Sequence, residues 1–411
     1  MKNEMPWWKE PTRGQWMAFL AAWLGWILDA FDFTIYLIVA PEIAKEFGVS
    51  QTAVMGSLTL TLLLRLAGGV AAGAMADRWG RKLPLMLSLV WFAVFDGLVA
   101  LAPSFAWVII LRTLFGFGMG AEWTAGSTLA MESWPARSRG IASGILQGSW
   151  AIGFLLAALV SAVVVPAFGW RALFVVAIAP ALLAMPIRWL VPESHTRKDA
   201  CVPVAPLAPV LGKLVSASLL MALGFGVYYA LTSAYALMLA GDHGLGPSDR
   251  WSLMATFNIG MLCGAIVTGW AAKKYGVRAV IAAPALLALP ALPLYVGAVP
   301  GTLGIGAFLG GALGVGFTGV VPMVLTDIFP AAVRARAVGI AYHAGAMVAA
   351  FVAPGIPALA AARGWTLGSA IALVAGAFLL TLATTVLLAG RVVMARSVAS
   401  GQNEPASATP A

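Results

Sequence analysis

The chain has 411 residues, of which 61% are hydrophobic and only 10% are charged, and its formal net charge is +9. Soluble domains carry about 45–50% apolar and about 25% charged residues, so this composition excludes a water-soluble protein. It predicts an all-α polytopic membrane protein. We assign the excess positive charge to loops on one side of the membrane, and we expect no nucleic-acid partner.

Apolar stretches follow one another along the chain, and each is close to the roughly 20 residues that cross a bilayer as a helix. Charged clusters and Pro/Gly turns separate them. The twelve expected spans are 16–40, 53–75, 84–102, 105–130, 140–165, 170–191, 213–240, 250–272, 279–298, 302–325, 335–361 and 365–390.

One long polar interruption divides these spans into two sets of six. We expect an N-terminal half at 1–191, a cytoplasmic linker at 192–212, a C-terminal half at 213–390 and a disordered cytoplasmic tail at 391–411. With the amino terminus inside, 19 of the 25 Lys and Arg residues fall in cytoplasmic segments, and Arg188 is counted among them. This asymmetry predicts that both termini lie in the cytoplasm.

The two halves repeat each other. A shift of 195 residues aligns Glu132 with Asp327 and Arg139 with Arg334. Parallel repeats of this kind place a substrate site near the bilayer midplane, between the halves. Because these four residues lie at the cytoplasmic ends of their spans, we expect them to latch the halves together during conformational gating.

A glycine-rich loop follows the second span, Gly73-Ala-Met-Ala-Asp77-Arg78-Trp-Gly80-Arg81-Lys82. It resembles the loop between helices 2 and 3 of the major facilitator superfamily. That resemblance implies twelve transmembrane helices in two pseudo-symmetric six-helix halves, the major facilitator fold. Glycine permits tight turns, and an acidic side chain such as Asp77 can cap a helix amino terminus. The gating residues expected in this loop are Gly73, Asp77, Arg78, Gly80 and Arg81.

Three further motifs carry a closer resemblance: Leu28-Asp29-Ala-Phe31-Asp32-Phe33, Glu132-Ser-Trp-Pro135 and Ala142-Ser143-Gly144-x-Leu146-Gln147. They look like the sialate:proton symporter family, which includes bacterial sialic acid transporters and lactate permeases. The resemblance implies proton-coupled transport of a carboxylate across a bacterial inner membrane. The chain departs from the fungal permeases in the seventh span, which has Tyr228, Tyr229 and Ser233 in place of a His and an Asp.

Ionisable residues inside the spans are few, and each costs at least about 2.5–3.5 kcal/mol at the centre of the membrane. They are Asp29, Asp32, Arg65, Asp96, Arg112, Glu122 and His343. Asp29 and Asp32 are three residues apart and share a helix face, and Arg65 reaches a similar depth. An arginine can hold a carboxylate by two parallel hydrogen bonds, and two adjacent carboxylates do not both ionise readily.

We therefore expect Arg65 and Arg112 to bind the substrate and Asp29, Asp32, Glu122 and His343 to couple transport to protons. The alternative is a static salt bridge between helices. The remaining substrate-binding candidates are Gln147, Tyr228, Tyr229, Ser233 and Asn258. This polar inventory is thin for a sugar acid, because unpaired polar groups are costly in a closed site.

The shortage favours a lactate- or pyruvate-type monocarboxylate carried by alternating access. Sialic acid or aromatic acid symport stays open, as does proton-independent facilitation or exchange. No HExxH, GxSxG or paired Cys/His set is present in the sequence, so we expect no enzyme activity and no metal site. We expect no cofactor besides the coupling proton, and a monomer in the lipid bilayer.

Overall fold

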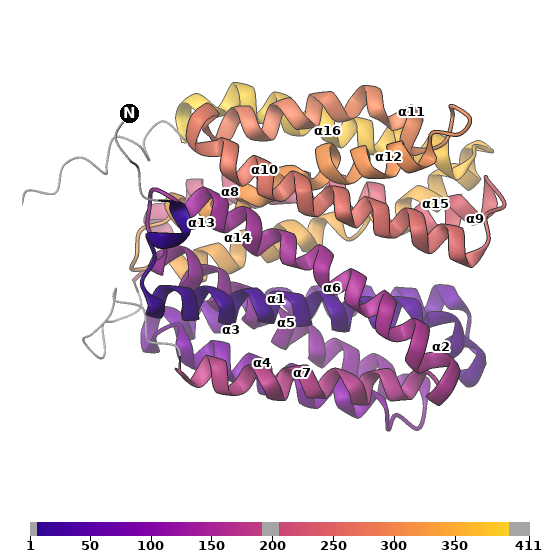
Figure 1. Ribbon diagram of the computed structural model, residues 1–411, viewed down its shortest axis with the longest axis horizontal. Helices are drawn as coiled ribbons and strands as arrows, with labels where there is room; N and C mark the ends of the chain where they lie inside the picture. Colours follow the sequence, from indigo (N-terminus) through magenta and orange to yellow (C-terminus); the bar gives the residue numbers. More distant parts are fainter. Residues whose placement is uncertain (1–5, 191–204, 394–411) are drawn as a thin grey trace, which may run out of the picture.

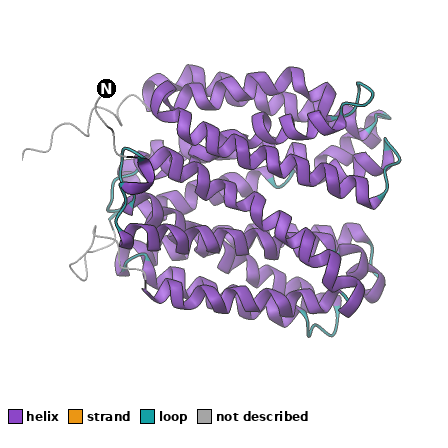
Figure 2. Ribbon diagram, viewed as in Figure 1, coloured by secondary structure: helices purple, strands orange, loops and turns teal. Residues whose placement is uncertain are grey.

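The computed structural model describes residues 6–190 and 205–393. Within these ranges the regular structure is entirely helical (Figure 2), which confirms the all-α prediction. The helices run along one another in two layers of the bundle, one for each half (Figure 1). Large apolar side chains such as Leu101, Phe168 and Leu388 lie on the outside with three quarters or more of their surface exposed, as a lipid-covered surface requires.

The N-terminal half contains seven α-helices. They are α1 (Arg13–Ile38), α2 (Ala40–Phe47), α3 (Gln51–Trp79), α4 (Lys82–Val99), α5 (Phe105–Ser133), α6 (Arg139–Phe168) and α7 (Trp170–Leu190). A short 3-10 helix, η1 (Trp7–Lys9), precedes α1. Thr12 begins α1 with a capping box, because its side chain accepts from the backbone of Gln15 while the Gln15 side chain accepts from Thr12.

The C-terminal half is more broken. Its α-helices are α8 (Leu211–Thr232), α9 (Tyr235–Gly241), α10 (Pro247–Ala288), α11 (Leu292–Tyr295), α12 (Leu303–Leu309), α13 (Val321–Ile328), α14 (Arg334–Ala349), α15 (Val352–Arg363) and α16 (Leu367–Val393). Shorter elements are η2 (Ala208–Val210), η3 (Leu289–Ala291), the π-helix η4 (Gly310–Val315) and the 3-10 helix η5 (Gly316–Val320).

Eleven helical segments of the described chain are long and apolar enough to span a membrane, against twelve expected spans. The difference lies at Gly276, where φ is 78° and ψ is 156° inside the continuous element α10. Glycine adopts this conformation without strain, and the chain turns there. The segment Pro247–Tyr295 therefore covers the expected span 250–272 and most of the expected span 279–298, and the twelve-helix major facilitator fold is confirmed.

The domain boundaries differ slightly from expectation. Most of the expected linker, 192–204, and most of the expected tail, 394–411, lie outside the described residues. Helix α16 continues to Val393, three residues beyond the expected end of the C-terminal half. The charge of Arg391 did not end the helix, since a charged residue can continue a helix past the apolar stretch.

We call the end of the bundle where α1 begins and α16 ends the terminal end, and the opposite end the far end; they lie at the left and right of Figure 1. At the far end, Glu46 of α2 accepts hydrogen bonds from Trp170 and Arg171 of α7. Burial acts to raise the pKa of Glu46, but these hydrogen bonds outweigh it and lower the pKa below its ordinary value. The contact ties the α1–α3 connection to the sixth span.

Candidate functional site: a central cavity between the halves

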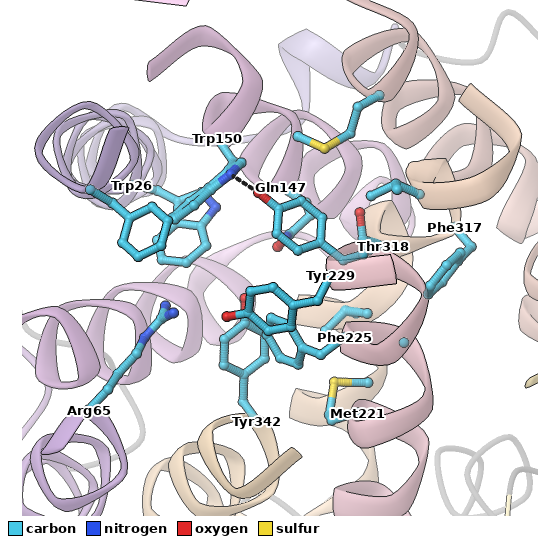
Figure 3. A pocket seen from close by; sticks show the side chains of 16 residues that line it. Trp26, Arg65, Gln147, Trp150, Met221, Phe225, Tyr229, Phe317, Thr318 and Tyr342 are labelled. Atoms are coloured by element: carbon cyan, nitrogen blue, oxygen red, sulfur yellow. Dashed lines mark hydrogen bonds between the residues drawn. The ribbon is translucent and has the colours of Figure 1, made fainter. Parts of the chain in front are cut away.

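A cavity of about 660 Å³, including its open mouth, lies between the two halves (Figure 3). Side chains from α1, α3 and α6 face it from one half, and side chains from α8, α10, η4, η5, α13 and α14 face it from the other. The sequence predicts walls mainly from spans 1, 4, 7 and 10, with spans 2, 5, 8 and 11 completing them, and all of these except span 4 contribute lining residues. Span 4, which is α5, contributes no lining residue in the described chain, because Tyr342 stacks on Trp123 at a centroid distance of 3.4 Å and covers it.

Arg65 carries the sole charge among the described residues that line the cavity. Its side chain comes from the middle of α3, is 3% exposed, and has no hydrogen-bond partner on Nε or Nη2. The rings of Trp26 and Tyr342 lie 5.6 and 5.7 Å from its Cζ (Figure 3), within the range of a cation–π interaction. A buried cation without a paired anion is costly, so the site is suited to a carboxylate ligand.

Asp29 and Asp32 are buried in α1, at 0% and 2% exposure. Both carboxylate oxygens of Asp29 and Oδ1 of Asp32 lack hydrogen-bond partners. Within the described ranges, neither aspartate forms an ion pair with Arg65, although Arg65 is within electrostatic reach of Asp29. The static salt bridge considered from the sequence is therefore not formed in this structure.

Arg112 does not line the cavity, so it is not placed to bind a substrate there as the sequence predicted. It makes an ion pair with Asp96 of α4, and the rings of Tyr36 and Phe115 lie 4.7 and 4.1 Å from its Cζ. The side chains of Arg112 and Asp96 are at most 2% exposed. The sequence placed both residues in the membrane but could not pair them, because helix rotation decides which side chains meet.

Glu122 also lies away from the cavity and has a partner that the sequence analysis misplaced. Arg188, counted as cytoplasmic, is a fully buried residue of α7. It donates two hydrogen bonds to Glu122, and Ser88 donates a third at 2.8 Å. Arg188 lies near the end of α7, and its long side chain reaches inward to the buried Glu122.

His343 of α14 joins the two halves beneath the cavity. Its Nε2 lies 3.1 Å from the Gly120 carbonyl oxygen and 3.3 Å from the Thr124 hydroxyl, both in α5. Its Nδ1 has no hydrogen-bond partner in the described chain. The residue is fully buried but does not line the cavity.

Three of the five polar candidates line the cavity, namely Gln147, Tyr228 and Tyr229. Trp150 donates a hydrogen bond to the Tyr228 hydroxyl at 3.0 Å (Figure 3). Ser233 and Asn258 do not line it, because each donates to a carbonyl of its own helix, at 2.6 and 2.9 Å. Sequence reasoning missed much of the apolar lining, since aromatic and Met residues in a membrane span look the same whether they face lipid or a cavity. These residues are Trp26, Phe33, Met221, Phe225, Met261 and Phe317.

The gating candidates gather at the terminal end. Arg139 pairs with Asp327 at 2.8 Å and Arg334 with Glu132 at 3.1 Å, so the four residues form two ion pairs between the halves. Glu132 also pairs with Arg81 at 2.9 Å.

The glycine-rich loop reaches across to the other half. Asp77 accepts hydrogen bonds of 3.1 Å from the backbone N–H groups of Ala335 and Arg336, which begin α14. Gly73 lies directly against the backbone of Arg336, where no Cβ would fit. Gly80 ends α3 with φ of 96°.

Arg78 differs from its neighbours in the loop. It lies over the ring of Trp79 at 5.1 Å and forms no hydrogen bond or ion pair between the halves in the described chain. The contacts of His343 with α5 and of Tyr228 with Trp150 join the halves in the middle of the bundle. Most other polar contacts between the described parts of the two halves lie at the terminal end. The halves are therefore latched at the terminal end; a gating role for these residues stays a prediction.

Within the described ranges, no group of three or more His, Cys, Asp or Glu side chains is placed to hold a metal ion.

Residues 22–249 match the family model described as the Major Facilitator Superfamily. The chain is 30% identical to the sialic acid transporter NanX of Escherichia coli (strain K12), over 83% of this chain and 86% of that protein. It is 29% identical to a probable 4-methylmuconolactone transporter of Cupriavidus pinatubonensis, over 86% of each chain.

Solved structures agree with these relatives on the fold. The proton:xylose symporter XylE, bound to 6-bromo-6-deoxy-D-glucose, superimposes with a TM-score of 0.78 at 19% identity, covering 91% of this chain and 95% of that one. The family resemblance read from the sequence is thus confirmed. The chain belongs to the Major Facilitator Superfamily and is a multi-pass membrane transporter, not an enzyme.

Proposed function

We propose that this transporter is a proton-coupled symporter of an organic monocarboxylate, which binds its carboxylate at Arg65 and its apolar body between aromatic side chains. The observation that carries the proposal is the buried Arg65 guanidinium, with two nitrogens unpartnered in an otherwise uncharged cavity. A substrate carboxylate would supply the missing anion through two parallel hydrogen bonds.

The rest of the lining favours a flat, unsaturated or aromatic body. Trp26, Trp150, Tyr228, Tyr229 and Tyr342 surround the space with rings, and ring faces and edges add attraction beyond the area they bury. A lactate-type acid would use Arg65 but leave most of these rings uncontacted. The probable 4-methylmuconolactone transporter among the relatives is named for a substrate with this kind of unsaturated body.

Sialic acid is the second candidate, because the chain is 30% identical to a sialic acid transporter. Its hydroxyl groups would need many hydrogen-bonding partners in a closed site. Gln147, Thr318, the tyrosine hydroxyls and the indole N–H groups of Trp26 and Trp150 are the polar side-chain groups besides Arg65 in the described lining. This number of polar groups supports a flat, unsaturated or aromatic monocarboxylate over a sugar acid that carries many hydroxyl groups.

Proton coupling is supported by Asp29, a buried acid of α1. Asp29 has no hydrogen-bond partner on either oxygen, so it is free to take up a proton when a second negative charge enters the cavity. One proton carried with one monoanion is electroneutral, and each pH unit then contributes about 1.4 kcal/mol of driving force. We propose further that the terminal end is cytoplasmic in a bacterial inner membrane, since the Lys and Arg residues concentrate there.

Uptake into proteoliposomes tests this function. Purified protein is reconstituted, and uptake of radiolabelled benzoate, lactate, pyruvate and sialic acid is measured with a pH gradient or a membrane potential imposed separately. We expect benzoate uptake that follows the pH gradient and responds little to voltage. Uptake driven by voltage alone, or equal uptake of all four acids, would contradict the proposal.

A further inference from the structure

The interior of the N-terminal half contains more acids than bases. Apart from Asp77 and Arg81 at the terminal end, seven acidic and basic side chains of the described half lie there, each at most 3% exposed: Asp29, Asp32, Asp96, Glu122, Arg65, Arg112 and Arg188. If all were charged, four carboxylates would face three guanidinium groups. An uncompensated charge away from water is costly, so one of the four acids holds a proton when the cavity is empty.

Two acids are already committed to arginines. Asp96 pairs with Arg112, and Glu122 accepts two hydrogen bonds from Arg188. Both pairs are neutral and nearly inaccessible to solvent. Arg112 and Arg188 cannot leave these partners without exposing an unpaired buried charge. Arg65 is therefore the cation available to balance Asp29 or Asp32.

The helix geometry of α1 separates these two aspartates. Trp26 and Phe33 line the cavity. At about 100° per residue, Asp29 lies about 60° around the helix from Trp26 and about 40° from Phe33, whereas Asp32 lies about 120° from Trp26. Asp29 is therefore next to the cavity wall, and Asp32 is turned towards the interior of the half.

Their charged neighbours agree with this separation. The charged neighbours of Asp29 include Arg65 of α3, together with Glu122, Arg188 and Arg112. The charged neighbours of Asp32 are Asp96 of α4, Arg112 of α5 and Asp29.

The surroundings of Asp32 complete this picture. Tyr36, one turn beyond Asp32, lies over the Arg112 guanidinium at 4.7 Å. Asp32 thus faces the Arg112–Asp96 ion pair, whose charges already cancel. A negative charge on Asp32 would therefore have no cation to balance it.

We propose that Asp29 takes up and releases the transported proton, whereas Asp32 keeps its proton through the whole transport cycle. This inference rests on the proposed function. In the empty cavity, the Asp29 carboxylate balances Arg65. When a substrate carboxylate binds Arg65, Asp29 loses its counter-charge and binds one proton. Release of substrate and proton on the other side restores the Asp29–Arg65 balance, so no net charge moves with the cycle.

Matched substitutions distinguish the two aspartates. Asparagine has the size of a protonated aspartate and cannot ionise, so Asp32→Asn replaces a permanently protonated group by its closest neutral equivalent. In proteoliposomes, a gradient of one pH unit supports up to about tenfold accumulation at one proton per anion. We expect Asp32→Asn to retain accumulation within about threefold of the unmodified protein and Asp29→Asn to lose it, while both retain exchange of labelled for unlabelled benzoate.

A second measurement does not depend on the Asp32 variant folding. Benzoate is added to purified, weakly buffered protein, and proton uptake is recorded with a pH dye. We expect about one proton per bound anion in the unmodified protein and none in Asp29→Asn, because Asp29 is the group that is protonated on binding.

The outcomes separate the inference from the function on which it rests. Loss of accumulation with retained exchange in Asp32→Asn, or undiminished proton uptake in Asp29→Asn, would overturn the division between the aspartates. An unmodified protein that neither follows the pH gradient nor takes up protons would instead contradict the proposed proton coupling itself.

Discussion

Arg65 and Arg112 lie in the same half of the protein, both almost fully buried, and they differ in what surrounds them. Arg112 is paired with Asp96 and flanked by two aromatic rings, so its charge is satisfied within the protein. Arg65 has aromatic neighbours as well but no paired carboxylate, and it faces a cavity. The comparison indicates that burial of an arginine in a membrane helix does not mark a binding site, whereas burial without a counter-ion at a cavity does.

The largest effect is expected at Arg112. Arg112→Gln leaves Asp96 as an unpaired buried charge, which should cost about 3–5 kcal/mol of stability. The measurement is the thermal midpoint and the yield of folded protein in detergent. The double variant Arg112→Met with Asp96→Leu should recover part of the loss, because it removes both charges. If Arg112→Gln has the same thermal midpoint as the unmodified protein, the Arg112–Asp96 ion pair does not stabilise the fold.

Arg65→Gln should affect substrate binding more than stability. It removes a cation that forms no ion pair, and Asp29 can bind a proton once Arg65 is gone, so the thermal midpoint should change less than in Arg112→Gln, whereas substrate binding should weaken by about 2–3 kcal/mol, roughly 30- to 150-fold. Titration calorimetry with benzoate measures the affinity. Arg65→Lys, which keeps the charge but not the two-pronged geometry, should give an intermediate affinity. Equal affinities for the unmodified and Arg65→Gln proteins would remove the basis of the proposed site.

Phe317 separates the cavity from a smaller apolar gap within the C-terminal half, and Met221 and Val321 line both spaces with it. Phe317→Ala should join them and favour acids with a longer apolar body. We expect uptake of 4-butylbenzoate relative to benzoate to rise about tenfold, since one methylene in an apolar pocket is worth about 1–3 kcal/mol. Val324→Ala is the matched control, because Val324 lines the smaller gap but not the central cavity. An unchanged ratio in Phe317→Ala would show that the ring does not limit the cavity.

The smallest effect is expected at the terminal end. The pair between Arg139 and Asp327 is partly exposed, at 22% and 42%, and exposed ion pairs contribute about 0.2–1 kcal/mol. Arg139→Gln should therefore lower the thermal midpoint only slightly, and high salt should abolish the difference. A loss as large as that of Arg112→Gln would contradict the distinction drawn here between buried and exposed pairs.

The sequence was sufficient to predict the fold because the bilayer restricts it strongly. Apolar length defined the spans, and the one apparent discrepancy is a glycine turn at Gly276 inside a continuous element. The candidate site was predicted less completely. Arg65 stood out as a charge in an apolar span, but the pairing of Glu122 with Arg188 could not be read from it. Which charged side chains form pairs depends on how the helices rotate and pack. Apolar residues such as Trp26 look the same in the sequence whether they line a cavity or face lipid.

The central claim, that Arg65 is the carboxylate site, is tested most directly by comparing benzoate with benzamide, its neutral equivalent of the same shape. Binding to the folded state raises the thermal midpoint. We predict that benzoate raises the midpoint of the unmodified protein while benzamide does not, and that this difference disappears in Arg65→Gln. Equal shifts from both compounds, or a preference for benzoate that persists in Arg65→Gln, would contradict the assignment of Arg65.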